Sequence, residues 1–105
     1  MQQKYQANTT PDGQGEFSGW TFLTNHTHIL VSLKRDPEMT VRNLSLQVGI
    51  TERSVQRILT DLEQSGVVTR MKSGRRNQYS VNEDFRLRYP LEANHTLKEL
   101  LEAVK

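Results

Sequence analysis

The chain has 105 residues, of which 34% are apolar, with a formal net charge of +2 and no cysteine. This length predicts one domain with tails, and the low apolar content predicts a small core. The missing cysteine excludes disulfides, thiolate nucleophiles and cysteine zinc sites. No apolar run approaches the roughly 18 residues that a bilayer requires, and the polar start lacks a signal segment. We therefore expect a cytoplasmic protein without membrane contact.

The N-terminal part predicts an arm followed by a helix. Residues 1–19 are rich in Gln, Asn, Thr and Gly, and we expect them to be disordered. Helical spacing predicts a first helix from Phe22 to Lys34, capped by Thr24 or Asn25. Its stripe consists of His26, Ile29, Leu30 and Leu33. Because Val31 lies off this stripe, we expect the helix to be covered on more than one side.

A short helix and a longer one are predicted after the breaker Asp36-Pro37. Thr40 is placed to cap a helix over Val41–Val48, and Gly49 to end it with a positive φ. Thr51 is placed to cap a helix over Glu52–Gln64, which Ser65-Gly66 ends. The apolar faces consist of Leu44 and Val48 in the first, and of Val55, Ile58, Leu59 and Leu62 in the second.

The remaining chain predicts a β-hairpin and a last helix. Val67–Lys72 and Gln78–Val81 are strand-like, with a basic turn over Ser73–Asn77 between them. Asn82–Pro90 is predicted to be a linker. The last helix is expected to run from about Leu91 or Thr96 to Val104, with Thr96 and Glu99 as a capping box. Its leucine stripe either packs on the chain's own core or forms a two-fold interface.

The segment from Val41 to Leu59 carries a helix-turn-helix pattern. Counted from Val41, the pattern requires a small fifth residue, Gly at the ninth position, and apolar residues at the fourth, eighth, tenth, fifteenth and eighteenth. All seven positions fit, with Ser45, Gly49, Leu44, Val48, Ile50, Val55 and Ile58. A small residue and a glycine permit a close crossing and a tight turn, so that one helix projects from the surface.

Three helices followed by a basic hairpin resemble the winged helix-turn-helix of MarR- and ArsR-like transcription regulators. The resemblance rests on Thr51–Leu59 and Asp61–Val68 and covers roughly residues 20–82. It implies a mainly α-helical fold with a small β-hairpin, and double-stranded DNA as the partner. The metal-binding cysteines of ArsR proteins are absent, and the long flanking spans of MarR proteins are absent or short.

Charge and helical geometry indicate which residues would bind DNA. The segment from Trp20 to Asn82 contains nine Lys or Arg and five Asp or Glu. Within it, Gln64–Asn82 has four basic residues and no acid, a clustering that suits a polyanionic partner. With the apolar face inside, Arg53, Gln56, Arg57 and Thr60 point outward, where Arg reads guanine and Gln reads adenine. The DNA-binding residues predicted are Arg42, Thr51, Arg53, Ser54, Gln56, Arg57, Lys72, Arg75, Arg76 and Asn77. Arg70 is a weaker candidate.

Other interpretations remain open beside DNA binding. Thr51 also serves as a cap, Arg57 could pair with Asp61, and the wing arginines could merely keep a strand edge soluble. The alternative function is a protein-interaction module without DNA binding. We expect no enzyme, cofactor or metal site, because His26 and His28 lack the i, i+4 spacing of a metal pair. Any small-molecule effector is unknown.

We thus expect three parts: a disordered arm (1–19), a winged helix-turn-helix domain (20–82), and a linker with a dimerising helix (83–105). Two recognition helices about one DNA turn apart require a symmetric dimer. We expect a homodimer on a pseudo-palindrome, formed through Trp20–Leu33 and Leu91–Val104.

Overall fold

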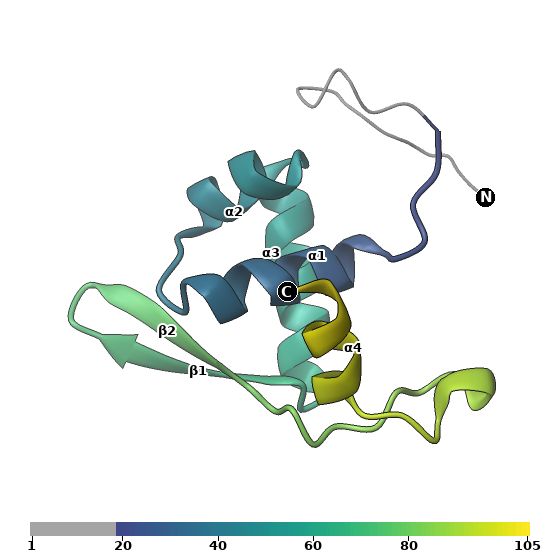
Figure 1. Cartoon of the computed structure of the whole chain (residues 1–105). Helices are drawn as coiled ribbons and strands as arrows, with labels where there is room; N and C mark the ends of the chain where they lie inside the picture. Colours follow the sequence, from purple (N-terminus) through teal and green to yellow (C-terminus); the bar gives the residue numbers. More distant parts are fainter. Residues whose placement is uncertain (1–18) are drawn as a thin grey trace.

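The computed structural model describes residues 19–105, so all of the predicted arm except Gly19 lies outside the described residues. The elements are α1 (Asn25–Arg35), α2 (Val41–Val48), α3 (Glu52–Gln64), β1 (Val68–Ser73), β2 (Arg76–Val81), a 3-10 turn η1 (Pro90–Glu92) and α4 (Leu97–Val104). Figure 1 shows α1 and α3 crossing at the centre, with the hairpin reaching to the side away from η1. Helices and hairpin confirm the winged helix-turn-helix fold.

The first helix begins later than predicted. Thr24 has the extended backbone of an N-cap, with φ −81° and ψ 171°, so Phe22 and Leu23 precede the helix. The Thr24 side chain makes no capping hydrogen bond. The Thr24 backbone carbonyl accepts the first helical hydrogen bonds, from the N–H groups of Thr27 and His28. The helix continues to Arg35, one residue beyond the prediction, and ends where Asp36 precedes a proline.

The bounds of α2 and α3 are those predicted, because local capping sets them. The Thr40 side chain accepts from the Asn43 backbone N–H, and Thr51 accepts from that of Ser54. Gly49 follows α2 with φ 84°, a left-handed conformation that costs glycine little. The chain therefore turns from α2 into α3 within three residues.

The hairpin turn is shorter than predicted. Pairing runs from Val68 opposite Val81 to Ser73 opposite Arg76, which leaves a two-residue turn of Gly74 and Arg75. Gly74 has φ 66°, as tight hairpin turns require. The prediction of a five-residue turn was wrong because Ser73, Arg76 and Asn77 were taken as loop, although they belong to the two strands.

The segment between the hairpin and α4 folds back on the core. Phe85 and Leu87 are partly buried against it, and the Leu97 N–H donates to the Phe85 carbonyl at 2.7 Å. Of the two predicted starts, Thr96 rather than Leu91 is right: Thr96 is the N-cap of α4, and both bonds of the predicted capping box are present. Leu97 and Leu101 are buried, so α4 packs on the chain's own core, the first of the two arrangements considered.

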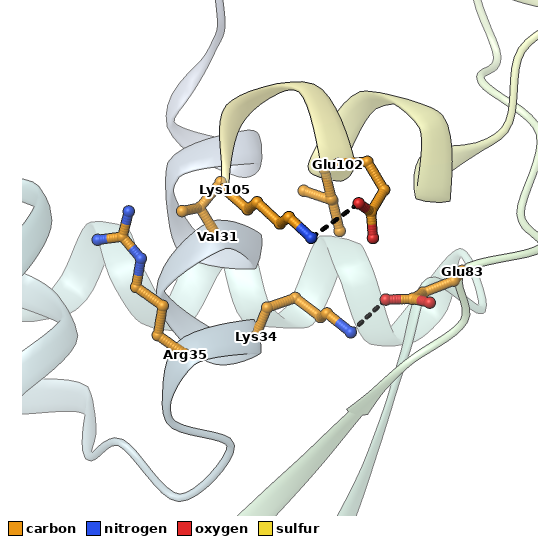
Figure 2. Close-up of a pocket in the computed structure, with 7 residues that line it drawn as sticks. Val31, Lys34, Arg35, Glu83, Glu102 and Lys105 are labelled. Atoms are coloured by element: carbon orange, nitrogen blue, oxygen red, sulfur yellow. Dashed lines mark ion pairs between the residues drawn. The ribbon is translucent and has the colours of Figure 1, made fainter.

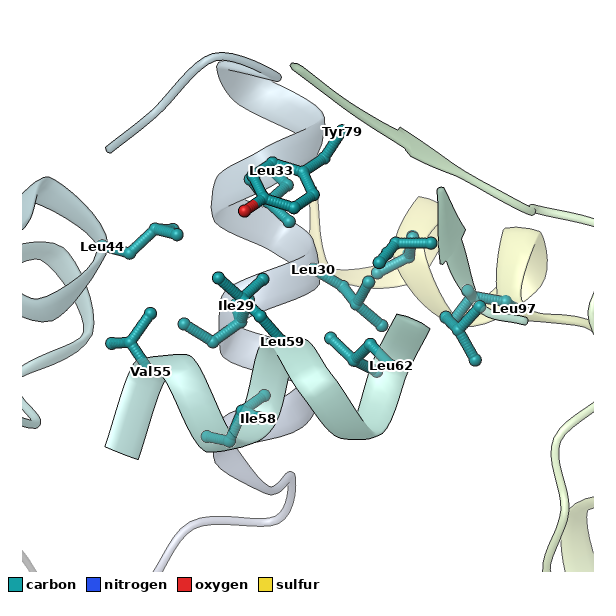
Figure 3. Close-up of a cluster of buried hydrophobic side chains, with 13 residues drawn as sticks. Ile29, Leu30, Leu33, Leu44, Val55, Ile58, Leu59, Leu62, Tyr79 and Leu97 are labelled. Carbon is teal, nitrogen blue, oxygen red and sulfur yellow. The ribbon is translucent and has the colours of Figure 1, made fainter. Parts of the chain in front are cut away.

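One hydrophobic core joins all helices and both strands (Figure 3). Its members are Ile29, Leu30, Leu33, Leu44, Val55, Ile58, Leu59, Leu62, Val67, Val68, Tyr79, Leu97 and Leu101. Val31 packs on its edge, as the sequence indicated, whereas His26 is only half-buried. Burial lowers the pKa of half-buried His28 below its usual value, so its neutral ring is favoured.

The fully buried Leu44 provides a test of the α2–α3 packing. Leu44→Ala should lower the free energy of unfolding by about 2–4 kcal/mol, because it leaves a cavity among closely packed neighbours. Urea denaturation measures this loss. Leu46 lies on the same helix but is 64% exposed, so Leu46→Ala should change stability by less than about 0.5 kcal/mol. Equal losses in the two variants would contradict the packing described.

Candidate nucleic-acid interface

The helix-turn-helix unit is closed by packing and by one side-chain hydrogen bond. Leu44 and Val55 are fully buried, and Val48 and Ile50 pack on the same core. The Ser45 hydroxyl donates to the Ile50 carbonyl at 2.6 Å, while the Ser45 carbonyl accepts from the N–H groups of Gly49 and Ile50. The sequence required a small residue at this position for the helix crossing. The structure adds that its hydroxyl fixes the turn.

The outer face of α3 presents the side chains that the periodicity placed there. Arg53, Gln56, Arg57 and Thr60 are all exposed, opposite the buried Val55, Ile58 and Leu62. Within residues 19–105, neither Arg53 nor Arg57 forms an ion pair. The expected Arg57 partner, Asp61, instead accepts a hydrogen bond from His26 Nε2 at 2.9 Å. Two guanidinium groups and one amide therefore stand on this face with their donors available.

The N-terminus of α3 is exposed and capped. The Thr51 hydroxyl accepts from the Ser54 N–H and donates to the Ser54 hydroxyl, both at 3.0 Å. Thr51 thus caps α3 in this structure, and the Ser54 N–H and hydroxyl both hydrogen-bond with it. The N–H groups of the first turn point outward along the helix axis, where they favour an anion such as phosphate.

The wing separates two arginines that the sequence placed together. Arg75 lies at the turn and is exposed, whereas Arg76 and Asn77 belong to β2, opposite Ser73 and Lys72. The prediction that Arg76 and Asn77 sit at the tip was therefore wrong. Arg76 Nη1 donates to the Glu38 carbonyl at 3.4 Å, which ties the strand to the α1–α2 connection.

A second bond holds the wing at the same place. The Tyr79 N–H donates to the Pro37 carbonyl at 2.9 Å, and the Tyr79 side chain is buried in the core. The consecutive carbonyls of Pro37 and Glu38 thus both accept hydrogen bonds from residues of β2. The connection acts as a short substitute for a third strand, and it holds β2 beside α1.

The other basic candidates differ in exposure and in ion pairing. Arg42 is exposed in the first turn of α2, and Lys72 is exposed on β1. Arg70 Nε lies 3.8 Å from a Glu63 carboxylate oxygen, a contact that draws this side chain toward the end of α3. Arg70 is accordingly the weakest of these candidates for phosphate contact.

A hollow of about 160 Å³ lies between α1 and α4 and is lined in part by Val31 and Leu101. Figure 2 shows its two ion pairs, Lys34 with Glu83 and Lys105 with Glu102. Small-molecule sites measure about 300–1,000 Å³. We therefore interpret this hollow as a seam between α1 and α4 that is edged by two ion pairs, neither of which joins the two helices, and not as an effector site.

In the described part of the chain, no three His, Asp or Glu side chains come together as a metal site would require. Among residues 19–105, every helix also falls short of the length and apolarity needed to cross a bilayer.

Comparison with known families bears on the same segment. Residues 23–69 match the family described as winged helix-turn-helix DNA-binding. The match runs from just before α1 into β1, somewhat less than half of the chain, and includes the whole helix-turn-helix unit. It supports DNA binding by this segment. Neither the curated proteins nor the solved structures gave a match.

Two structural features that support the candidate site were not predicted from the sequence. The carbonyls of Pro37 and Glu38 carry no side-chain signal, and their strand partners lie about forty residues further along the chain. The Ser45 bond to Ile50 is local, and a serine placed five residues before a turn carbonyl could have indicated it.

The Arg76 bond predicts different behaviour for the two wing arginines. Arg76→Ala should speed hydrogen exchange of the β2 amides about two- to fivefold, because one bond that holds the strand is lost. Exchange followed by NMR in the free chain measures this. Arg75→Ala is the matched control and should leave these rates unchanged. If the two variants exchange alike, Arg76 does not hold the wing.

Proposed function

We propose that this chain binds double-stranded DNA in a sequence-specific manner and acts as a prokaryotic transcription regulator of the MarR- and ArsR-like kind. α3 would enter the major groove, and the hairpin would contact the flanking backbone or minor groove. The proposal rests on Arg53 and Arg57, which are exposed on the second helix of a helix-turn-helix and form no ion pair with any residue from 19 to 105. The family match over residues 23–69 supports it.

Each predicted residue has a role that its position allows. Arg53, Gln56 and Arg57 would read base edges, since guanidinium pairs with guanine and amide with adenine. Arg42, Lys72 and the capped start of α3 at Thr51 and Ser54 would bind phosphates. Arg75 would be the main wing contact, because the Gly74–Arg75 turn leaves it at the tip. Arg76 and Asn77, within β2, would support it.

We further propose a homodimer that binds a pseudo-palindrome. One copy presents a single α3, whereas two copies related by a two-fold axis place two such helices about 34 Å apart along the DNA. The described molecule has extents of 37 × 34 × 23 Å, so adjacent copies reach a spacing of this order.

Arg57 provides the sharpest test of base reading. Arg57→Ala should weaken binding to a preferred duplex by about 1–3 kcal/mol and relax preference at one base pair, because a bidentate contact is lost. Fluorescence anisotropy with the duplex selected from a random pool measures both effects. Arg35→Ala, an exposed arginine at the end of α1, should bind like the parent. Equal affinities for Arg57→Ala and the parent would remove Arg57 from the interface.

Salt dependence separates DNA binding from the alternative of a protein-interaction module. Binding to random duplex should fall steeply between about 50 and 200 mM salt, because phosphate contacts release counterions. A protein-docking domain would show little duplex binding at any salt concentration. Titration of the full chain at several salt concentrations measures the slope, and a flat, weak response would overturn the proposed function.

A further inference from the structure

Four large apolar side chains are exposed in two separate segments at the end of the molecule away from the hairpin tip (Figure 1). Trp20 and Phe22 are 72% and 90% exposed, and Tyr89 and Leu91 are 62% and 85% exposed. Figure 1 shows their two segments, the chain entering α1 and the η1 turn, on the same side. The Trp20 and Phe22 rings contact each other edge to face at 4.8 Å, and neither is covered by the described chain.

A hollow of about 400 Å³ is lined by His26, four residues after Phe22 in the chain, and by Arg88, which precedes Tyr89. None of the four exposed apolar residues lines it. The buried Leu62 and Val67 contribute apolar surface to it.

The acid and the arginine that line the hollow are already paired, whereas the Gln64 side chain, which also lines it, has no hydrogen bond within residues 19–105. His26 donates to Asp61 at 2.9 Å, and Arg88 donates to the Ser65 hydroxyl at 3.3 Å. An aromatic side chain entering the hollow would therefore meet apolar surface and an arginine, with no uncompensated acid. A guanidinium also stacks favourably on aromatic rings.

We infer that this aromatic face, formed by Trp20, Phe22, Tyr89 and Leu91, binds the same face of a second copy of the chain. The Trp20–Phe22 pair of each copy enters the hollow of the other. This inference rests on the proposed function, since it assigns a contact surface to the proposed homodimer. The α1 and α4 stripes cannot provide that surface, because Ile29, Leu30, Leu97 and Leu101 are buried in their own core.

The area of the face fits a dimer. The three aromatic side chains would bury about 150–250 Å² each, so together with Leu91 the face would bury on the order of 600 Å² per copy. A standard interface buries about 800 Å² per partner, and the rim of the hollow supplies the rest. Each copy offers both the aromatic pair and the hollow, so the contact is self-complementary and closes at two copies.

The position of the face also suits two DNA-binding units. Contact at this end leaves the hairpin tip and α2 pointing away from the partner (Figure 1). The two α3 helices would then lie about one molecular width apart, and the described extents include 34 Å.

Light scattering and sedimentation of the full chain without DNA test the inference. The parent should be dimeric at micromolar concentration, whereas Trp20→Ser combined with Phe22→Ser should raise the dimer dissociation constant at least about 100-fold. Leu91→Asp should act likewise from the other segment. Leu46→Ser combined with Met71→Ser removes two exposed apolar side chains elsewhere and should remain dimeric. Thermal unfolding of the dilute proteins checks that all variants fold.

A parent that stays monomeric at 100 µM overturns the inference, as do face variants that keep the dimer mass. If the face binds another kind of molecule instead of a second copy, the parent would stay monomeric. DNA binding is measured separately, so a chain that dimerises without binding duplex would refute the proposed function and leave the interface intact. A monomer that binds duplex would refute the interface and the proposed homodimer but leave the proposed DNA binding intact.

Discussion

The packing of α2 against α3 is the constraint on which the rest of the structure depends. Leu44 and Val55 are both fully buried and lie next to each other in Figure 3. Gly49 permits the turn between the helices, and the Ser45 hydroxyl closes it on Ile50. The direction of Arg53 and Arg57 follows from this angle, because the same helix that buries Val55 and Ile58 must expose the opposite face.

The elements predictable from sequence were those whose signals are local. The bounds of α2 and α3 were predicted correctly, because Thr40 and Thr51 cap the two helices and Gly49 ends the first of them. The start of α1 was missed because Phe22 and Leu23 are apolar, although the Thr24 backbone is extended. The tail was partly missed because Phe85 and Leu87 make a linker sequence fold back on the core.

The exposure of the candidate site was predictable, but its supports were not. Helical periodicity placed Arg53, Gln56 and Arg57 on the surface. The His26 bond to Asp61 and the Arg76 bond to Glu38 join residues 35 and 38 positions apart, and no spacing rule indicates them. Both bonds engage a charged residue that composition alone would count as free.

The two-residue turn of the hairpin limits how a wing of this type can vary in length. Side chains alternate between the two faces of a strand, so a single inserted residue would reverse every face beyond it or force a bulge. The wing could then lose the bond between Tyr79 and Pro37. Lengthening without such a change requires one residue added to each strand, which extends the reach by about 3.3 Å. Relatives or designed variants with longer wings should therefore differ from this chain by even numbers of hairpin residues.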